Sequence, residues 1–170
     1  MDRKVIKYMK DLVKKIYHMI VPWGDTNKKM NKIIKKMNMA RERGNKIASG
    51  YYCHKLEKKY QCRITPGSVI GKNLRIPHPN GITIGHGSRI GNDVLIYQQV
   101  TIGQNQGKYP TIGDNVIIYA GAKIIGGIRI GNNCIIGANA VVTKSFPANC
   151  IIGGVPAKKI KNRGPEDRYK

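Results

Sequence analysis

The chain has 170 residues, enough for one domain with a short extension but not for two full domains. Its 31 lysines and arginines outnumber 9 acidic residues, and the formal net charge of +22 favours polyanionic partners: nucleic acid, anionic lipid or a phosphate-bearing cofactor. No basic stretch is interleaved with aromatic residues and no apolar run approaches the ~20 residues that cross a bilayer, so we expect a cytoplasmic protein without a nucleic-acid partner.

Residues 1–59 are predicted to form a basic α-helical extension. Apolar residues recur there at three- and four-residue spacing, with lysines between them: Val5, Ile6, Met9, Leu12, Val13, Ile16, Tyr17 and Ile20. Pro22 and Gly24 end this helix. Asp25 or Thr26 caps a second helix, whose apolar stripe occupies positions 30, 33, 34 and 37. Each narrow apolar face either packs against the protein or a second subunit, or lies on the inner face of a membrane.

After residue 60 a six-residue period replaces the helical pattern. Aliphatic residues fall at this spacing, in three runs: Ile64, Ile70 and Ile76; Ile84, Ile90, Ile96 and Ile102; and Ile112, Ile118, Ile124, Ile130, Ile136 and Val142. Glycine often follows the isoleucine, and Asn or Asp comes one or two residues later, as in the segment 131–133. These residues tolerate the positive φ of a tight corner. The pattern predicts a triangular solenoid that closes a coil about every eighteen residues around an isoleucine core.

Residues from about Tyr60 to Ile160 resemble the hexapeptide-repeat acyltransferases, as do the segments 137–144 and 153–158. The resemblance implies a mainly β fold: a left-handed parallel β-helix over residues 60–160, after the helical extension of residues 1–59 and before a tail of residues 161–170. It also implies a homotrimer with each active site between two subunits.

Two interruptions of the repeat are expected to carry the site. The interval from Ile76 to Ile84 holds two extra residues and that from Ile102 to Ile112 holds four. Insertions in a solenoid become loops on one face, which is often the binding face. The first insertion contains His78, and the second is the segment 104–110. We expect both to contribute to one site.

His78 is the candidate catalytic residue. The segment from His78 to Gly85 resembles the catalytic histidine segment of serine acetyltransferases, in which a histidine precedes Gly-Ile-x-Ile/Val-Gly by two residues. An imidazole with its usual pKa near 6.5 suits removal of a proton from an alcohol that attacks a thioester. The alternative is a structural histidine in a loop. No Gly-x-Ser-x-Gly elbow is present, so direct transfer without a covalent enzyme intermediate is expected.

Three departures from serine acetyltransferases bear on the acceptor. Arg63 stands where they have the aspartate that orients the histidine, Pro77 replaces an aspartate that holds serine, and Lys108-Tyr109-Pro110 replaces Arg-His-Pro. The main hypothesis is therefore acetyl transfer to a surface-polysaccharide sugar, with acceptor contacts from Arg63, Asn80, Lys108 and Tyr109. Asn80 or a backbone carbonyl would orient His78. The alternatives are serine acetylation for cysteine biosynthesis and a non-catalytic binding protein.

The resemblance implies acetyl-CoA as co-substrate. It places the coenzyme along a groove beside Ala120, Ala138, Thr143 and Lys144, with Lys158 and Lys161 near the phosphates. Small residues with exposed amides and nearby cations suit such a long anionic ligand. No metal is expected, because Cys53, His54 and Cys62 lack a fourth ligand at a usual spacing.

Overall fold

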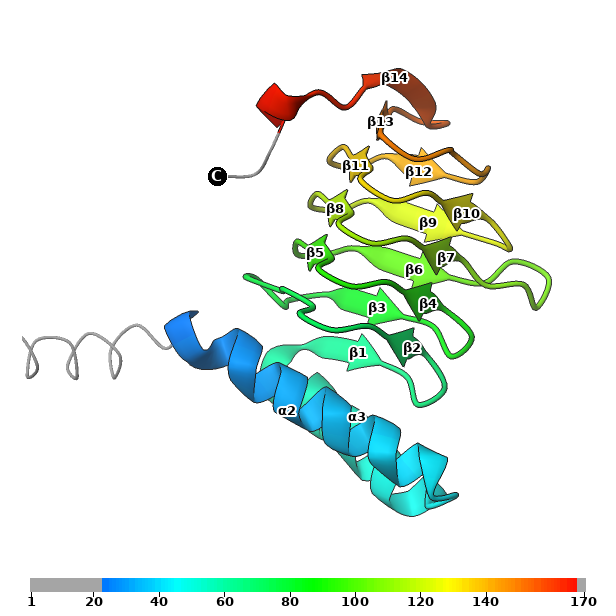
Figure 1. Cartoon of the computed structure of the whole chain (residues 1–170). Coiled ribbons are helices and arrows are strands. Elements are labelled where there is room, and N and C mark those ends of the chain that lie inside the picture. Colours follow the sequence, from blue (N-terminus) through cyan, green and yellow to red (C-terminus); the bar gives the residue numbers. More distant parts are fainter. Residues whose placement is uncertain (1–22, 168–170) are drawn as a thin grey trace, which may run out of the picture.

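The computed structural model of the chain describes residues 23–167, which form two helices and a β-solenoid (Figure 1). The helices are α2 (Trp23–Glu42) and α3 (Lys46–Tyr60), and a short 3-10 helix, η1 (Pro165–Asp167), ends the described chain. The strands are β1 (Cys62–Ile64), β2 (Val69–Ile70), β3 (Ile82–Ile84), β4 (Arg89–Ile90), β5 (Leu95–Ile96), β6 (Thr101–Gly103), β7 (Thr111–Ile112), β8 (Ile117–Ile118), β9 (Lys123–Ile125), β10 (Arg129–Ile130), β11 (Ile135–Ile136), β12 (Val141–Val142), β13 (Cys150–Gly153) and β14 (Lys158–Asn162).

Three sheets form the three faces of the solenoid, and each takes about every third strand. Their orders are β1-β3-β6-β9-β12, β2-β4-β7-β10 and β5-β8-β11-β13-β14. The strands pair in parallel from coil to coil, except that β14 runs antiparallel to β13. The predicted parallel β-helix with a helical N-terminal extension is confirmed.

The six-residue period fills the interior. Ile84 pairs with Ile102, which pairs with Ile124 in the next coil, and all three are fully buried. Equivalent rows run through the other two sheets, as in Ile96, Ile118 and Ile136. These rows of buried aliphatic side chains build a continuous ladder that stabilises the stack of coils.

The corners correct one detail of the sequence interpretation. At the corner after β4, for example, the positive φ of 55° belongs to Asp93 and not to Gly91. Asn115 and Asn133 repeat this conformation in the next coils, and the Asn115 side chain donates a hydrogen bond of 2.8 Å to Asn133. Gly91 is required for a different reason: an added Cβ would lie 2.6 Å from the backbone carbonyl of Gly113 in the adjacent coil.

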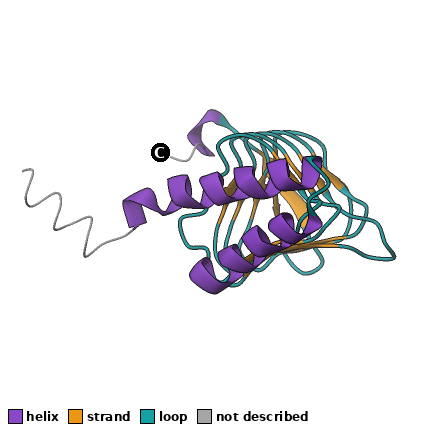
Figure 2. Cartoon of the chain, turned by 90° about the horizontal axis from the view of Figure 1, so that it is seen from below, coloured by secondary structure: helices purple, strands orange, loops and turns teal. Residues whose placement is uncertain are grey.

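Helix α2 closes the open end of the first coil. Asn27 Oδ1 accepts a hydrogen bond of 2.6 Å from the backbone N–H of Ile76, and Asn31 Nδ2 donates one of 2.9 Å to the Leu74 carbonyl. Figure 2 shows α2 and α3 side by side across this end of the solenoid. The helices thereby satisfy backbone groups that would otherwise form an open edge.

The helical extension was only partly predicted. The expected stripe is confirmed, since Met30, Ile34 and Met37 are buried. The predicted cap at Asp25 or Thr26 is wrong, because α2 begins at Trp23. Helix α3, which was not predicted separately, is capped by Asn45, whose side chain accepts a 2.9 Å hydrogen bond from the Ala48 N–H. The helix expected over residues 5–20 lies outside the described residues. Within residues 23–167, neither helix is both long and apolar enough to cross a membrane.

Candidate active site

The first insertion presents His78 at one edge of the β1-β3-β6-β9-β12 sheet. The loop is anchored on both sides: the Gly81 N–H donates to the Gln61 carbonyl, and the Asn80 carbonyl accepts from the Gln99 N–H, each at 2.9 Å. Pro79 is buried, whereas His78 and Asn80 are exposed. The imidazole is thus held on a fixed backbone and remains accessible to a ligand.

One tyrosine ring lies next to His78, and a second stacks on the first in the next coil of the solenoid. The Tyr97 ring centroid lies 6.4 Å from that of His78, and the Tyr97 and Tyr119 rings stack at 5.4 Å with an interplanar angle of 13°. Each tyrosine directly follows the inward-facing isoleucine of its strand, β5 or β8. We call Tyr97 and Tyr119 the tyrosine stack. In the next coil this position is Gly137, so the stack ends there.

Gln98 and Lys123 also lie at this edge and were not predicted. Lys123 Nζ donates to the Gln99 carbonyl at 2.7 Å and to Thr101 Oγ1 at 3.3 Å. Among the described residues, Gln98 Oε1 is buried and has no hydrogen-bond partner.

The second insertion forms a small hairpin at the opposite edge of the same sheet. Asn105 and Lys108 exchange two backbone hydrogen bonds of 3.0 Å across Gln106 and Gly107, which both have positive φ. The Tyr109 ring packs over a corner of the coil below, since a Cβ added at Gly85 would lie 2.9 Å from it. The stem of Lys108 packs against Gly127 in the coil above. Neighbouring coils on both sides therefore support this loop.

A single chain does not bring the two insertions together. The first insertion leads into β3 and the second follows β6, and these strands are parallel and in register at Thr83 and Thr101. One loop therefore lies at the amino-terminal edge of the sheet and the other at its carboxyl-terminal edge (Figure 1). Both loops can contribute to one site only when two copies of the chain meet.

The predicted acceptor contacts are divided in the same way. Asn80 is next to His78 in the loop, and exposed Arg63 lies in β1, in register with Thr83. Lys108 and Tyr109 belong to the opposite edge. Arg63 and Lys108 therefore cannot share one acceptor within a single chain.

The predicted coenzyme contacts also fall at two edges. Ala120 and Ala138 are stacked at the edge that carries His78, where the Asn139 N–H donates a 2.9 Å hydrogen bond to the Ala120 carbonyl. Thr143 and Lys144 follow β12 and are exposed at the other edge. The remaining cations of the set lie on β14.

Comparisons with known proteins agree with this architecture. The family described as "Bacterial transferase hexapeptide (six repeats)" matches residues 109–144. Coils with the same six-residue period continue on both sides of the matched residues. Over these residues the solenoid is similar to the hexapeptide-repeat transferases.

Two similar curated proteins are both serine acetyltransferases. The chain is 47% identical to a serine acetyltransferase of Mycobacterium tuberculosis over 106 residues, covering 60% of this chain and 46% of the relative. It is 48% identical to a serine acetyltransferase of Staphylococcus aureus over 105 residues, covering 59% and 49%. The chain thus spans about half the length of the curated relatives it matches.

Solved structures show the same similarity. A serine acetyltransferase from Brucella abortus superposes with a TM-score of 0.76 and 32% identity, covering 79% of this chain and 57% of that one. The same enzyme in complex with coenzyme A gives a TM-score of 0.74 and 31% identity, covering 78% and 55%. A protein of similar fold therefore binds coenzyme A.

The two β14 lysines differ in their surroundings. Lys161 Nζ lies 3.0 Å from Asp167 Oδ1 and 3.8 Å from Glu166 Oε1. The hydrogen bond that Lys161 donates to Asp167 raises the pKa of Lys161, and the two carboxylates offset its charge. Lys158 is exposed at the start of β14. The preceding residue, Ala157, donates a backbone hydrogen bond to the Val141 carbonyl. Lys158 is the better placed of the two to attract a phosphate.

The cysteines of the hexapeptide-repeat chain are packing residues. Burial raises the pKa of the Cys62 thiol to about 12, and burial also raises the pKa of Cys134. A protonated thiol is a poor nucleophile. Among residues 23–167, no group of three or more His, Cys, Asp or Glu side chains is arranged to hold a metal ion.

Proposed function

We propose that this chain transfers an acetyl group from acetyl-CoA to a hydroxyl acceptor, with His78 as the general base. The observation that carries the proposal is the exposed imidazole, anchored in an insertion at the same solenoid edge as Ala120 and Ala138. Similarity to serine acetyltransferases, one of them in complex with coenzyme A, supports the donor and the type of reaction.

The chemistry requires one proton acceptor. As the acceptor hydroxyl attacks the thioester carbonyl, the imidazole of His78 takes its proton. When the tetrahedral intermediate collapses, the C–S bond breaks and the imidazolium returns the proton to the departing thiolate of CoA. General base catalysis of this kind contributes ~10²–10⁴-fold to the rate.

The division of the predicted contacts between two edges supports a site between two copies of the chain, and the homotrimer is the assembly that the family resemblance implies. In our proposal, the edge with His78, Ala120 and Ala138 faces the opposite edge of a second copy, which supplies Lys108, Tyr109, Thr143 and Lys144. The coenzyme would lie between the two subunits, with its phosphates toward Lys158 and less toward Lys161. Mixing chains with His78→Ala and chains with Lys108→Ala tests this, because mixed trimers would recover activity at wild-type edges.

L-Serine is the first acceptor to test, because the relatives are serine acetyltransferases, and its product would serve cysteine biosynthesis. The comparisons do not support the sugar acceptor favoured by the sequence. One observation nevertheless keeps a sugar of a surface polysaccharide as a second candidate. Tyr119 ends the tyrosine stack and is 36% exposed, and the apolar face of a pyranose ring packs well on an exposed aromatic ring.

A thiol-release assay decides between these acceptors. Purified protein is given acetyl-CoA and either L-serine or a panel of neutral and anionic sugars. Serine-dependent release of CoA supports the first candidate, and release with saccharides alone supports the second. If no hydroxyl compound accelerates release above hydrolysis, the non-catalytic binding protein is favoured. For sugar acceptors, Arg63→Ala with Lys108→Ala is expected to reduce turnover of anionic sugars more than neutral ones.

We further propose that the enzyme works in the cytoplasm and contacts the inner face of the membrane through its basic helices. Such contact would bring the enzyme close to membrane-linked acceptors.

A further inference from the structure

A groove runs along the line where α2 and α3 meet. On α2 it is lined by residues at helical spacing, positions 29, 33, 36 and 40, with Arg43 just past the end of the helix, and on α3 by positions 48, 52, 55 and 59. Two cavities of about 350 and 230 Å³, which share Lys36 and Tyr52, make up the groove. We call it the helix-pair groove. It lies beside the face of α2 that carries buried Met30, Ile34 and Met37, and Ile33 and Tyr52 in its floor pack against that core.

The rims of the helix-pair groove are strongly cationic. Its basic lining residues are Lys29, Lys32, Lys36, Arg43, Lys55 and Lys59. None of the described lining residues is acidic. Like charges at this density repel one another, so a multivalent anionic partner would lower the energy of the surface.

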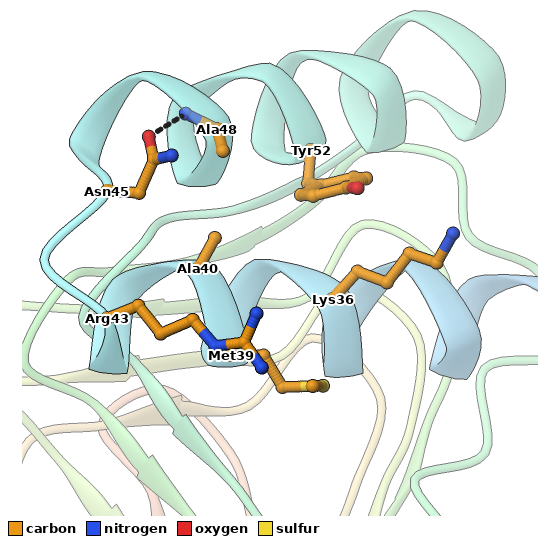
Figure 3. Close-up of a pocket in the computed structure, with 7 residues that line it drawn as sticks. All are labelled: Lys36, Met39, Ala40, Arg43, Asn45, Ala48 and Tyr52. Carbon is orange, nitrogen blue, oxygen red and sulfur yellow. Dashed lines mark hydrogen bonds between the residues drawn. The ribbon is translucent and has the colours of Figure 1, made fainter.

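The floor between these rims is apolar. Ile33, Ala40, Ala48 and the ring of Tyr52 lie between the helices, and all four are half-buried. Figure 3 shows the Tyr52 ring between the two helices, with Lys36 extending from α2 and the Arg43 side chain, just past the end of α2, lying along that helix. Lysine stems can cover such a floor while their charged ends reach outward.

Exposed apolar side chains extend this surface beyond the groove. Ile47 is 89% exposed, Tyr51 58% and Met39 39%, and all three lie on the helix pair. Cations beside exposed aliphatic and aromatic groups on a helix surface are typical of proteins that bind in the interface of an anionic membrane. A nucleic acid would match the cations but would leave Ile47 against a polar backbone. A second copy of this face is disfavoured by its like charge.

We propose that the helix-pair groove docks on the anionic surface of a phospholipid membrane, with its cations at the lipid phosphates and Ile47, Tyr51 and Met39 in the interfacial layer. The inference stands apart from the catalytic proposal, because it uses no residue of the active site. Asn27 and Asn31 of α2 bond the segment Leu74–Ile76, which leads directly to the His78 insertion. Docking would therefore place the first coil, and with it His78, nearest the membrane.

Vesicle binding by two full-length variants of equal charge tests the proposal. In the groove variant, Lys32, Lys36, Lys55 and Lys59 are changed to Gln. In the control variant, four exposed cations of the solenoid that no site uses are changed to Gln: Lys72, Arg89, Arg129 and Lys159. Sedimentation with phosphatidylcholine vesicles, with and without about 30 mol % phosphatidylglycerol, measures partitioning.

Wild type and control are expected to bind the anionic vesicles, and the groove variant to bind at least about tenfold more weakly, since each lysine contributes up to about fivefold. Ile47→Ser, which preserves every charge, is expected to weaken binding about threefold even in high salt. Equal loss in the groove and control variants would overturn the proposal, because general charge would then explain binding. The proposal would also be overturned if the groove variant lost binding to a labelled DNA duplex but still bound the anionic vesicles.

Circular dichroism and thiol release on the same samples separate this test from the catalytic proposal. If the groove variant retains wild-type turnover of a soluble acceptor but loses vesicle binding, docking is supported independently of catalysis. If the chain has no transferase activity at all, the vesicle result is unaffected.

Discussion

Adding one methyl group should have opposite effects on stability at two glycines. Gly91 lies at a corner where the Gly113 backbone carbonyl of the next coil would be 2.6 Å from a new Cβ. Neither backbone can withdraw easily, because Gly91 N–H and Gly113 N–H each donate a 2.9 Å ladder hydrogen bond. Gly91→Ala is therefore expected to destabilise the fold by about 2–3 kcal/mol, the upper part of the usual range for overpacking.

Gly50 is the matched control for this change. It lies within α3, has ordinary helical φ, and has no heavy atom within 4 Å of an added Cβ. Replacement of a helical glycine by alanine stabilises a helix by about 0.8–1 kcal/mol. Gly50→Ala is thus expected to be more stable than the wild type, and the two alanine variants should differ by about 3–4 kcal/mol.

Thermal unfolding followed by circular dichroism measures both changes. For a chain of this size, 1 kcal/mol corresponds to about 2–4 °C in Tm. We expect Gly50→Ala to unfold a few degrees above the wild type and Gly91→Ala several degrees below it. A Gly91→Ala protein as stable as the wild type would show that adjacent coils do not approach as closely as the structure indicates.

Three further predictions concern the thiols, the coenzyme and the second insertion. Burial raises the folded-state pKa of Cys62 from 9.0 to about 12. The stability that the protonated Cys62 thiol contributes is therefore complete below pH 9 and is lost as the pH rises toward 12. In the Cys62→Ala variant, the free energy of unfolding should decline less steeply over this pH range. Lys158→Ala should raise the KM for acetyl-CoA several-fold, and Lys161→Ala should raise it less, because carboxylates already offset the Lys161 charge. Steady-state kinetics at a fixed acceptor concentration measure both values. Equal increases in KM for the two variants would contradict this prediction. Tyr109→Ala removes a proposed acceptor contact, so the KM for the acceptor should rise, and it also removes the ring that packs on Gly85, so Tm should fall; an unchanged KM would place this loop outside the site.

The core could be predicted because the inward-facing aliphatic positions of successive short strands, such as Ile84, Ile90, Ile96 and Ile102, recur every six residues and are buried. Helix α3 could not be recognised in the same way. Its fully buried positions are Ser49 and Leu56, seven residues apart, so no continuous apolar stripe marks it. Its amino-terminal cap, Asn45, was the available sign. The start of α2 was misjudged because Gly24 was taken as a helix breaker, whereas it lies in the first turn.

The insertions could be located from the change in spacing, but their separation depends on strand direction. Parallel strands β3 and β6 place one insertion before the sheet and the other after it. The tyrosine stack was missed because the second insertion lies between Tyr97 and Tyr119 and lengthens their interval beyond the regular eighteen residues. The carboxylate partner of Lys161 was missed because Asp167 lies in the tail, where no repeat predicts a contact. His86 is exposed, and its ring lies over Gly67.

The most direct test of the account is acetyl transfer by His78→Ala, measured in a single turnover beside CoA affinity determined by calorimetry. We expect turnover to fall by ~10²–10⁴-fold while CoA affinity stays at the wild-type value, because the imidazole moves a proton and does not hold the coenzyme. His86→Ala, an exposed histidine at the opposite edge, should keep full turnover. Wild-type turnover in the His78→Ala protein would contradict the assignment of the general base.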